Sequence, residues 1–452
     1  MKDCRGLELS AASIEAVQAF DETITAYLGL RPDTGDKLKA IFEADPEMPM
    51  AHCLKGYFFH LMGSGGLLPR ARQAFDTATR FVASATPREQ AHVKALGLWC
   101  DDDHQGAGAV WEDILQDHPL DALALRLAHH AHFYSGDAAA MRASIDRVFP
   151  AWDESLSGYG FVLGMRAFAY EESGNYAEAE KTGRLAVETQ ADDPWAIHAV
   201  AHVMEMQDRQ REGIEWIKGL EPHWVDANNF RYHLWWHRAL MHLGVGENEE
   251  VLRLYDEDLW DADSDEYLDL CNDVALLSRL EMQGVDVGER WLPVADKVKG
   301  RTKEHILSFI DAHFAIALGA VGDWQSAEQL VETFSIRGGQ IRDTIGAPLC
   351  RALVAHRRGA FGDALSELKT IHGDIRRIGG SNAQRDLFEQ IYINAAIGAG
   401  ELSTACSLLE GRTIEKPGNA LSWQMYGNVL SAMGQDSKSS DAHARANTLL
   451  RD

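Results

Sequence analysis

The segment YGFVLGMRAFAYEESGNYAEAEKTGRLAVETQA, residues 159–191, decides the fold of this chain. Two stretches with helical spacing of apolar residues flank a short polar turn at Gly174, and glycine is the residue type that most often ends a helix. Ala167 and Ala179 are small enough to let the two helices approach closely. The segment therefore predicts a hairpin of two packed helices.

The same hairpin recurs along the chain. The first copy matches the tetratricopeptide pattern of about 34 residues at Ala167, Tyr170, Gly174, Tyr176, Ala179 and Ala186. A second copy, over 310–334, has the same offsets at Ala315, Leu318, Gly322, Trp324 and Ala327. A third copy near the C-terminus offers Trp423, Gly427, Leu430 and Ala446. Weaker copies are placed at 50–63, 89–119, 122–150, 194–220, 230–259, 267–296, 341–371 and 383–409.

These repeats predict an all-α fold, a tetratricopeptide-like α-solenoid of about eleven helical hairpins, more than the three or so that a stable stack needs. We expect a single array over residues 1–452, wound into a closed or superhelical ring with a concave pocket. Residues 1–48 are expected to cap one end, 49–410 to form the core repeats and 411–452 to form the last repeat and cap. Irregular units within 194–323 favour a binding site there, although longer loops could simply thicken the stack.

Composition limits the class of protein and its partners. The formal net charge is −26, 46% of the residues are hydrophobic, and no apolar run is long enough to span a membrane. Binding to nucleic acid or anionic lipid draws its free energy from Lys and Arg, so this charge predicts no nucleic-acid and no membrane partner. Six cysteines without a CxxC pair indicate reduced thiols, and no secretory signal is visible, so we expect a cytoplasmic protein. The sequence does not decide whether the protein forms an oligomer.

Two HxxxH pairs lie on successive predicted helices, His198 with His202 and His233 with His237. Residues four apart share one face of a helix, and neighbouring helices of a stacked array can direct all four rings into one space. Glu205 continues the first stripe three residues after His202. The pattern predicts either a functional site or a polar seam between helices.

Other polar and aromatic side chains are expected on or beside the concave face, because the first helix of each such hairpin faces that side. The register places there Tyr57, His60, His92, Trp99, Arg126, His130 and Trp195. Beside the groove we expect Trp236, Asp273, Asp311 and His313. A lone histidine on a half-buried helix is usually a core residue bonded to a carbonyl group. Recurrence on neighbouring hairpins favours a ligand site over that structural alternative.

The stretches HAVAHVMEM, YHLWWHRAL, VDVGERWLPVADK and EHILSFIDAHFAIALGAVGD resemble segments of the tetratricopeptide repeat protein 38 family. The similarity is strongest from Trp195 to Asp323 and is only repeat-like near the C-terminus. The family's histidine-bearing segments correspond here to His198, His202, Glu205, His233, His237, Asp311 and His313. The resemblance implies an all-helical repeat fold and implies little about activity.

Two kinds of function fit these residues. The first is a binding scaffold whose concave groove holds a small molecule or a peptide, as repeat solenoids commonly do. The second is an enzyme of hydrolase or lyase type, because imidazoles paired with carboxylates exchange protons near neutral pH. Its candidate catalytic residues are His198, His202, Glu205, His233, His237, Asp311 and His313.

A metal-dependent version of the enzyme uses the same histidines. In that version His198, His202, His233 and His237 bind Zn, Fe or Mn. The HxxxH spacing is a weak signal by itself, and Ala199 stands where the zinc peptidase motif HExxH has its glutamate. The sequence therefore leaves the metal, the substrate and the choice between scaffold and enzyme open.

Overall fold

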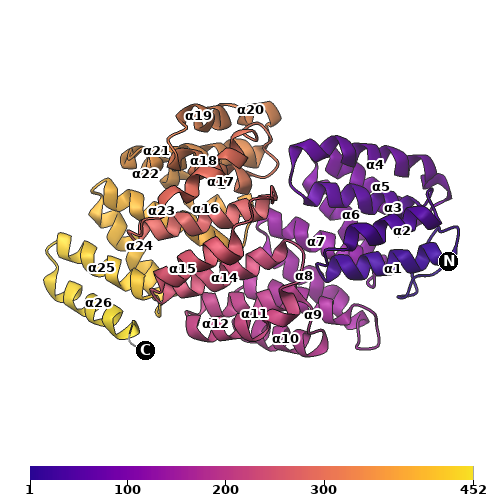
Figure 1. Cartoon of the computed structure of the whole chain (residues 1–452), viewed down its shortest axis with the longest axis horizontal. Helices are drawn as coiled ribbons and strands as arrows, with labels where there is room; N and C mark the ends of the chain where they lie inside the picture. Colours follow the sequence, from indigo (N-terminus) through magenta and orange to yellow (C-terminus); the bar gives the residue numbers. More distant parts are fainter. Residues whose placement is uncertain (451–452) are drawn as a thin grey trace. The chain divides into compact units, whose positions relative to one another are not determined.

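The structure is a computed structural model that describes residues 1–450 (Figure 1). It divides into two compact units, which we describe separately. The first unit comprises Met1–Val200 and Leu220–Arg231, and the second comprises Ala201–Gly219 and the chain from Tyr232 onward. The single array over 1–452, with its caps and core, stays a prediction.

The first unit consists of consecutive helical hairpins. Its helices are α1 (Ile14–Leu28), α2 (Thr34–Ala44), α3 (Pro49–Leu61), α4 (Leu68–Phe81), α5 (Pro87–Cys100), α6 (His104–Asp117), α7 (Ala122–Ser135), α8 (Ala138–Val148), α9 (Tyr159–Glu172), α10 (Tyr176–Thr189) and the short α13 (Glu221–Trp224). Each odd-numbered helix from α1 to α9 packs against the next helix, and neighbouring hairpins contact each other, as in α3 with α5 and α7 with α9.

Side-chain caps fix where these helices begin. At α5 the hydroxyl of Thr86 accepts the N–H of Glu89, and the Glu89 carboxylate accepts the N–H of Thr86. Asp121 caps α7 by accepting the N–H of Ala124 at 2.9 Å. Such bonds satisfy N–H groups that have no partner inside the helix.

The hairpin predicted over 159–191 is present as α9 and α10. Gly174 lies in the turn with φ +76°, which favours glycine. Ala167 and Ala179 are buried between the helices. A Cβ atom on Gly183 would lie 2.5 Å from Cγ2 of Val200, so glycine is needed where α10 meets the next helix.

The second unit is built in the same way. Helix α11 (Pro194–Met206) begins in the first unit and ends in the second. The remaining helices are α12 (Gln210–Gly219), α14 (Phe230–Gly244), α15 (Asn248–Leu254), α16 (Tyr267–Met282), α17 (Trp291–Lys299), α18 (Ser308–Ala320), α19 (Trp324–Glu332), α20 (Phe334–Arg337), α21 (Ala347–Arg357), α22 (Phe361–Ile371), α23 (Asn382–Gly398), α24 (Leu402–Glu415), α25 (Ala420–Ala432) and α26 (Asp436–Leu449).

The other two clear repeat copies are also hairpins. One is α18 with α19, joined by Gly322 at φ +72°, with Ala315 and Ala327 buried. The other is α25 with α26, joined by Gly434 at φ +73°. The predicted all-helical, tetratricopeptide-like repeat fold is confirmed.

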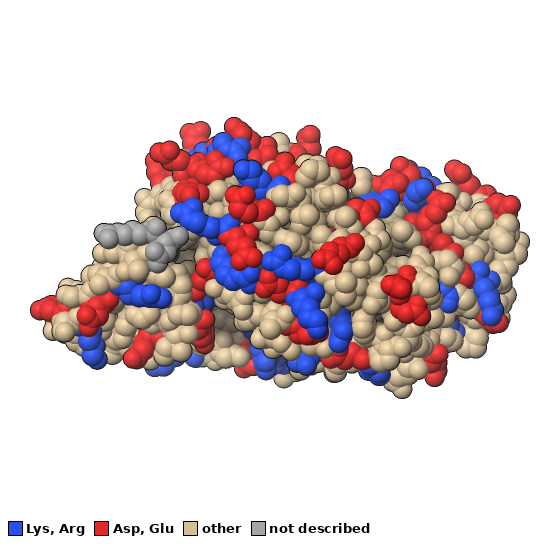
Figure 2. Space-filling model, turned by 90° about the horizontal axis from the view of Figure 1, so that it is seen from below, with Lys and Arg blue, Asp and Glu red and all other residues tan. Residues whose placement is uncertain are grey.

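Two general features bear on partners. Among the helices of residues 1–450, none combines the length and the apolar character that crossing a membrane requires. The face drawn in Figure 2 carries basic side chains interspersed with acidic ones. Charge on this face is therefore mixed on the scale of single side chains, although the whole chain is strongly negative.

Candidate functional site

Helices α11 and α14 carry the two HxxxH pairs. Helix α11 begins at Pro194, which suits the first position because proline has no N–H to satisfy. The Asp193 carboxylate just before it accepts the N–H of Trp195 at 3.0 Å. Helix α14 begins at Phe230, whose N–H donates to the side chain of Asn228 at 3.0 Å. These starts fix the register, so that each histidine pair lies on one face of its own helix.

Three histidines of the second unit lie together. His202, His233 and His237 each have a ring nitrogen within 4.8 Å of the others. The ring centroids of His202 and His237 are 4.4 Å apart, and those of His233 and His237 are 4.7 Å apart. All three side chains are buried. His198 lies one turn before His202 on α11.

Oxygen atoms hold two of these rings. Nδ1 of His237 lies 2.7 Å from Oε2 of Glu205, and Nδ1 of His233 lies 3.0 Å from Oδ1 of Asn272. Burial lowers the pKa of both rings well below the usual value, and the neighbouring His202 lowers it further. The two imidazoles are therefore neutral at pH 7, and each can donate from Nδ1 while Nε2 keeps its lone pair.

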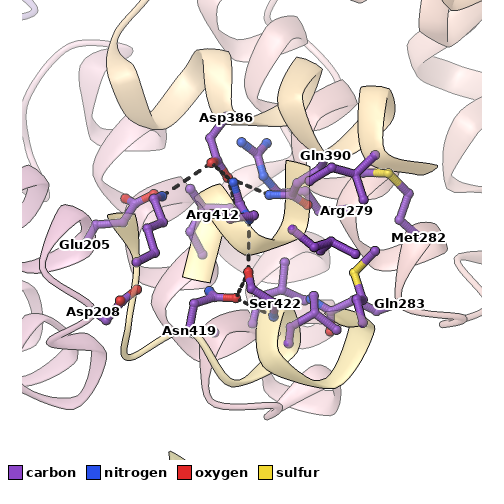
Figure 3. Close-up of a pocket in the computed structure, with 18 of the residues that line it drawn as sticks. Glu205, Asp208, Arg279, Met282, Gln283, Asp386, Gln390, Arg412, Asn419 and Ser422 are labelled. Carbon is purple, nitrogen blue, oxygen red and sulfur yellow. Dashed lines mark hydrogen bonds and ion pairs between the residues drawn. The ribbon is translucent and has the colours of Figure 1, made fainter. Parts of the chain in front are cut away.

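A pocket in the second unit adjoins these rings through Glu205 (Figure 3). Its empty space, counted together with the adjoining open solvent, is about 900 Å³. Charged side chains of both signs line it: Glu205, Asp208, Arg279, Asp386, Arg412 and Lys416. Apolar side chains complete much of the wall: Leu240, Leu243, Met282, Ile393, Leu409 and Met425.

Asp386 is the centre of an ionic network in this pocket. The Arg412 guanidinium donates to both carboxylate oxygens of Asp386, at 2.6 and 2.9 Å, and Nζ of Lys416 lies 3.4 Å from one of them (Figure 3). Nε of Arg412 also donates to Oγ of Ser422 at 3.0 Å. Burial by itself would raise the pKa of the Asp386 carboxyl, but the two cations hold it well below its usual value. Asp386 is therefore a carboxylate.

Arg279 is a second cation in the pocket, and it is more deeply buried. Its Nη1 and Nη2 atoms donate to the carbonyl oxygens of Ala275 and Ala383 at 3.1 and 2.9 Å. Burial lowers its pKa, whereas Asp386 and Glu205 raise it. Guanidinium groups stay charged in proteins. Two backbone carbonyls thus hold a permanent positive charge at the pocket wall.

Asp208 joins distant parts of the second unit. Its Oδ2 atom accepts the N–H of Gly418 at 2.9 Å, across 210 residues of sequence. Helices α11 and α12 on one side of the pocket are thereby tied to the loop between α24 and α25 on the other.

Several predicted ligand residues form an aromatic cluster in the first unit instead. The Arg126 guanidinium lies 4.0 Å from the Trp195 ring centroid. The rings of Phe168 and His198 lie 4.8 and 5.1 Å from the same ring. His130 lies at its edge, at 6.4 Å, and burial followed by the nearby Arg126 lowers its pKa well below the usual value. Arg126, His130 and Trp195 are thus brought together, and their role in ligand binding stays a prediction.

Asp193, beside this cluster, predicts a pH dependence of stability. Burial raises the pKa of its carboxyl to about 7, against the opposing effects of Arg126 and of the Trp195 N–H. The stabilisation from a raised carboxyl pKa is present below the unfolded pKa of about 4 and is lost as the pH rises through the folded pKa. The non-titrating Asp193→Asn variant should therefore gain about 2–3 kcal/mol relative to the wild type between about pH 5 and pH 8. Urea unfolding of both proteins measures this gain, and a pH-independent difference would contradict it.

Four more predicted ligand residues pack on one another in the first unit. The hydroxyl of Tyr57 donates to the carbonyl oxygen of His92 at 2.7 Å, and Nε2 of His92 lies 3.1 Å from Oδ2 of Asp121. His60 stacks on Trp99 with ring centroids 4.7 Å apart. These bonds join neighbouring hairpins, and a ligand role for Tyr57, His60, His92 and Trp99 stays a prediction.

Asp311 and His313 have separate partners in the second unit. Asp311 lies 3.1 Å from Nδ1 of His305, whereas Nδ1 of His313 donates to the carbonyl oxygen of Phe309 at 2.7 Å. Burial lowers the pKa of His313 to about 4, which leaves its ring neutral. These bonds do not pair the two side chains, and their catalytic role stays a prediction.

Two other predicted residues of the second unit are buried. Trp236 stacks on His233, with ring centroids 5.1 Å apart, and its ring centroid lies 4.8 Å from that of His237. Burial, and then the nearby Asp269, raise the pKa of the Asp273 carboxyl well above its usual value. Asp273 is therefore expected to be protonated, and ligand binding by Trp236 and Asp273 stays a prediction.

The cations of the pocket were missed by the sequence reasoning. Arg279 lies on α16, Arg412 on α24 and Lys416 just after α24. None belongs to a motif. Arg412 and Lys416 are four residues apart, but Arg279 comes from a distant part of the chain, and only the packing of the second unit brings it to them.

Comparisons with known proteins find only distant structural likenesses. No family model matches the sequence. The structure titled human IFIT1 dimer with PPP-AAAA is 14% identical, with a TM-score of 0.43, over 98% of this chain and 97% of that one. The human IFIT1 dimer with m7Gppp-AAAA is 13% identical, with the same TM-score, over 98% and 97% of the two chains. These likenesses do not identify what this chain binds.

The exclusion of nucleic acid drawn from the net charge is wrong. The similar IFIT1 structures hold the oligonucleotides PPP-AAAA and m7Gppp-AAAA. Net charge is a sum over the whole chain, so it overlooks local groups of cations. Here Arg279, Arg412 and Lys416 line one pocket of a chain with charge −26. The sign of the total charge thus excludes no phosphate-bearing partner.

Proposed function

We propose that this protein binds a small polar molecule with a carboxylate or phosphate group in the pocket of the second unit. The observation that carries the proposal is the placement of Arg279, Arg412 and Lys416 around one hollow with an apolar wall. Ligand sites are mostly apolar clefts in which a few placed polar groups fix the orientation of the ligand. The chain is then a binding repeat protein, as the first of the two sequence hypotheses expects.

The cations in the pocket are suited to such a ligand in different ways. Arg412 and Lys416 are both paired with Asp386. The Lys416 ammonium lies farther from the carboxylate, at 3.4 Å, than the Arg412 guanidinium does, at 2.6 Å. Arg279 is fixed by two carbonyl groups and has further N–H donors, since guanidinium carries five. Hydrogen bonds to charged groups contribute about 1.5–3 kcal/mol, so removing one such contact should weaken binding about 10–100-fold.

The test uses small anions and a matched pair of charge deletions. Pyrophosphate, AMP and citrate are titrated at low salt into the wild type, Lys416→Gln and Lys438→Gln, with calorimetry as the readout. Lys416 lines the pocket, whereas Lys438 is exposed on α26. We expect at least one anion to bind the wild type and the Lys438 variant equally, and the Lys416 variant about 10-fold more weakly. Equal losses in both variants, or binding of a 5′-triphosphate oligonucleotide alone, would contradict the proposal.

An enzyme remains the second candidate because of one observation. The Glu205 carboxyl, which lines the pocket, is hydrogen-bonded to His237. Such a pair can take up and return a proton at a ligand held in the pocket, as a hydrolase or lyase requires. Conversion of a bound anion by the wild type, followed by mass spectrometry and lost in Glu205→Gln, would favour the enzyme over the scaffold.

The resemblance to one repeat family supports a further proposal about relationship. The segments around His202, His237 and His313 resemble the tetratricopeptide repeat protein 38 family, and we infer that this chain is related to it. This relationship implies no particular activity. It predicts that a ligand found for this protein will also bind other members of that family.

A further inference from the structure

We propose that His202, His233 and His237 bind one divalent transition-metal ion, with zinc as the expected occupant. Their ring nitrogens lie within 4.8 Å of one another on two packed helices. Zn–N bonds of about 2.0–2.1 Å place tetrahedral ligand atoms roughly 3.3 Å apart. Small rotations of the three rings would bring their nitrogens from within 4.8 Å of one another to that separation.

The atoms behind two of the rings match those found around metal-binding histidines. Such a histidine usually donates its second ring N–H to a carboxylate or carbonyl oxygen, which fixes the tautomer and orients the ring. His237 has Glu205 in that place at 2.7 Å, and His233 has Asn272 at 3.0 Å. In both rings Nδ1 is engaged, so Nε2 is the atom that would face the ion.

The charge near the three histidines does not oppose a cation. Arg279 is positive, but Glu205 and Asp386 lie near it and offset its charge.

Three histidines leave one position of a zinc ion for a water molecule or a ligand. Because Glu205 lies both behind His237 and in the pocket wall, the ion would stand beside the pocket. The metal role expected for His198, which belongs to the first unit, stays a prediction. The metal proposal does not depend on the anion proposal, since it rests on the histidines alone.

The experiment measures metal binding directly. The full chain is produced without a histidine tag, stripped with EDTA, and titrated with Zn²⁺ by calorimetry and with Co²⁺ by visible absorption. We expect one ion per chain and the intense visible bands of four-coordinate Co²⁺. X-ray absorption of the zinc form should show imidazole ligands at about 2.0–2.1 Å, a readout that needs no variant.

Variants assign the ligands. We expect His202→Ala and His237→Ala to weaken Zn²⁺ binding at least about 100-fold. Glu205→Gln, which changes the hydrogen-bond partner of His237, should weaken it about 10–100-fold. His372→Ala is the matched control, because His372 is half-exposed and bonded to Glu389 elsewhere in the unit, and it should bind as the wild type does. Circular dichroism of each metal-free variant checks that the fold is retained.

The possible results separate the two proposals. Absence of bound metal in the wild type, or equal loss in His372→Ala and His237→Ala, would overturn the metal site. Anion binding by the EDTA-treated protein would leave the proposed function standing even if the metal site fails.

Discussion

Asp386→Ala is expected to lower the free energy of unfolding of the second unit by about 3–5 kcal/mol, because the substitution leaves two cations without their carboxylate in a mostly buried site. The side chain of Asp386 is 14% exposed, and those of Arg412 and Lys416 are 10% and 12% exposed. At such burial an unpaired charge is poorly solvated. Hydrogen exchange of α23 and α24, measured by mass spectrometry, reports the loss where it occurs.

The control for Asp386 is another aspartate in an ion pair. Asp36 and Lys39 lie 2.6 Å apart, but their side chains are 75% and 74% exposed. Solvent screens an exposed ion pair, so Asp36→Ala should change stability little. Equal effects of the two substitutions would show that burial of the Asp386 network has been overestimated.

Asp121→Ala should destabilise the first unit by a similar amount, about 3–5 kcal/mol, with loss of a helix cap added. Asp121 accepts from Nη1 of Arg88 at 2.6 Å and lies 3.1 Å from Nε2 of His92, and all three side chains are buried. Burial alone would raise the pKa of Asp121, but Arg88 and His92 hold it far below the usual value. Removal of the Asp121 carboxylate would leave the buried Arg88 guanidinium without its ion-pair partner. Urea unfolding followed by circular dichroism measures the change.

Two further substitutions separate the charge from the cap. Asp121→Asn keeps a capping oxygen and removes the charge, so it should retain most of the destabilisation. Asp137 caps α8 by the same bond, to Ala140 at 2.9 Å, but in an exposed position, so Asp137→Ala should cost only about 1 kcal/mol. If Asp121→Ala and Asp137→Ala proved equal, the cap rather than the ion pair would explain the first result.

The hairpins could be predicted because their determinants are local. Small residues such as Ala167 and Ala179 allow close contact within one repeat, and Gly174 closes the turn between its two helices. The sequence also predicted which residues share a helix face, because His198 and His202 are four residues apart. These features require only the geometry of a single helix or a single hairpin.

Features that depend on packing between hairpins could not be predicted. The contact of His92 with Asp121 is one such feature, because Asp121 comes from the next hairpin. The approach of Arg279 and Arg412 depends on how α16, α23 and α24 pack, an arrangement that builds up over many residues. The bond from His237 to Glu205 is of the same kind, because it joins α14 to α11.

The bond from Asp208 to Gly418 changes how the second unit can come apart. A row of hairpins held only by its neighbours can fray from a free end one unit at a time. Here the loop before the last hairpin is tied to a turn 210 residues earlier. Closing so long a loop is slow and entropically unfavourable, so it should form late in folding. Once formed, this bond links the C-terminal hairpin to the turn at Asp208. Deletion of that hairpin would therefore destabilise helices near the middle of the chain.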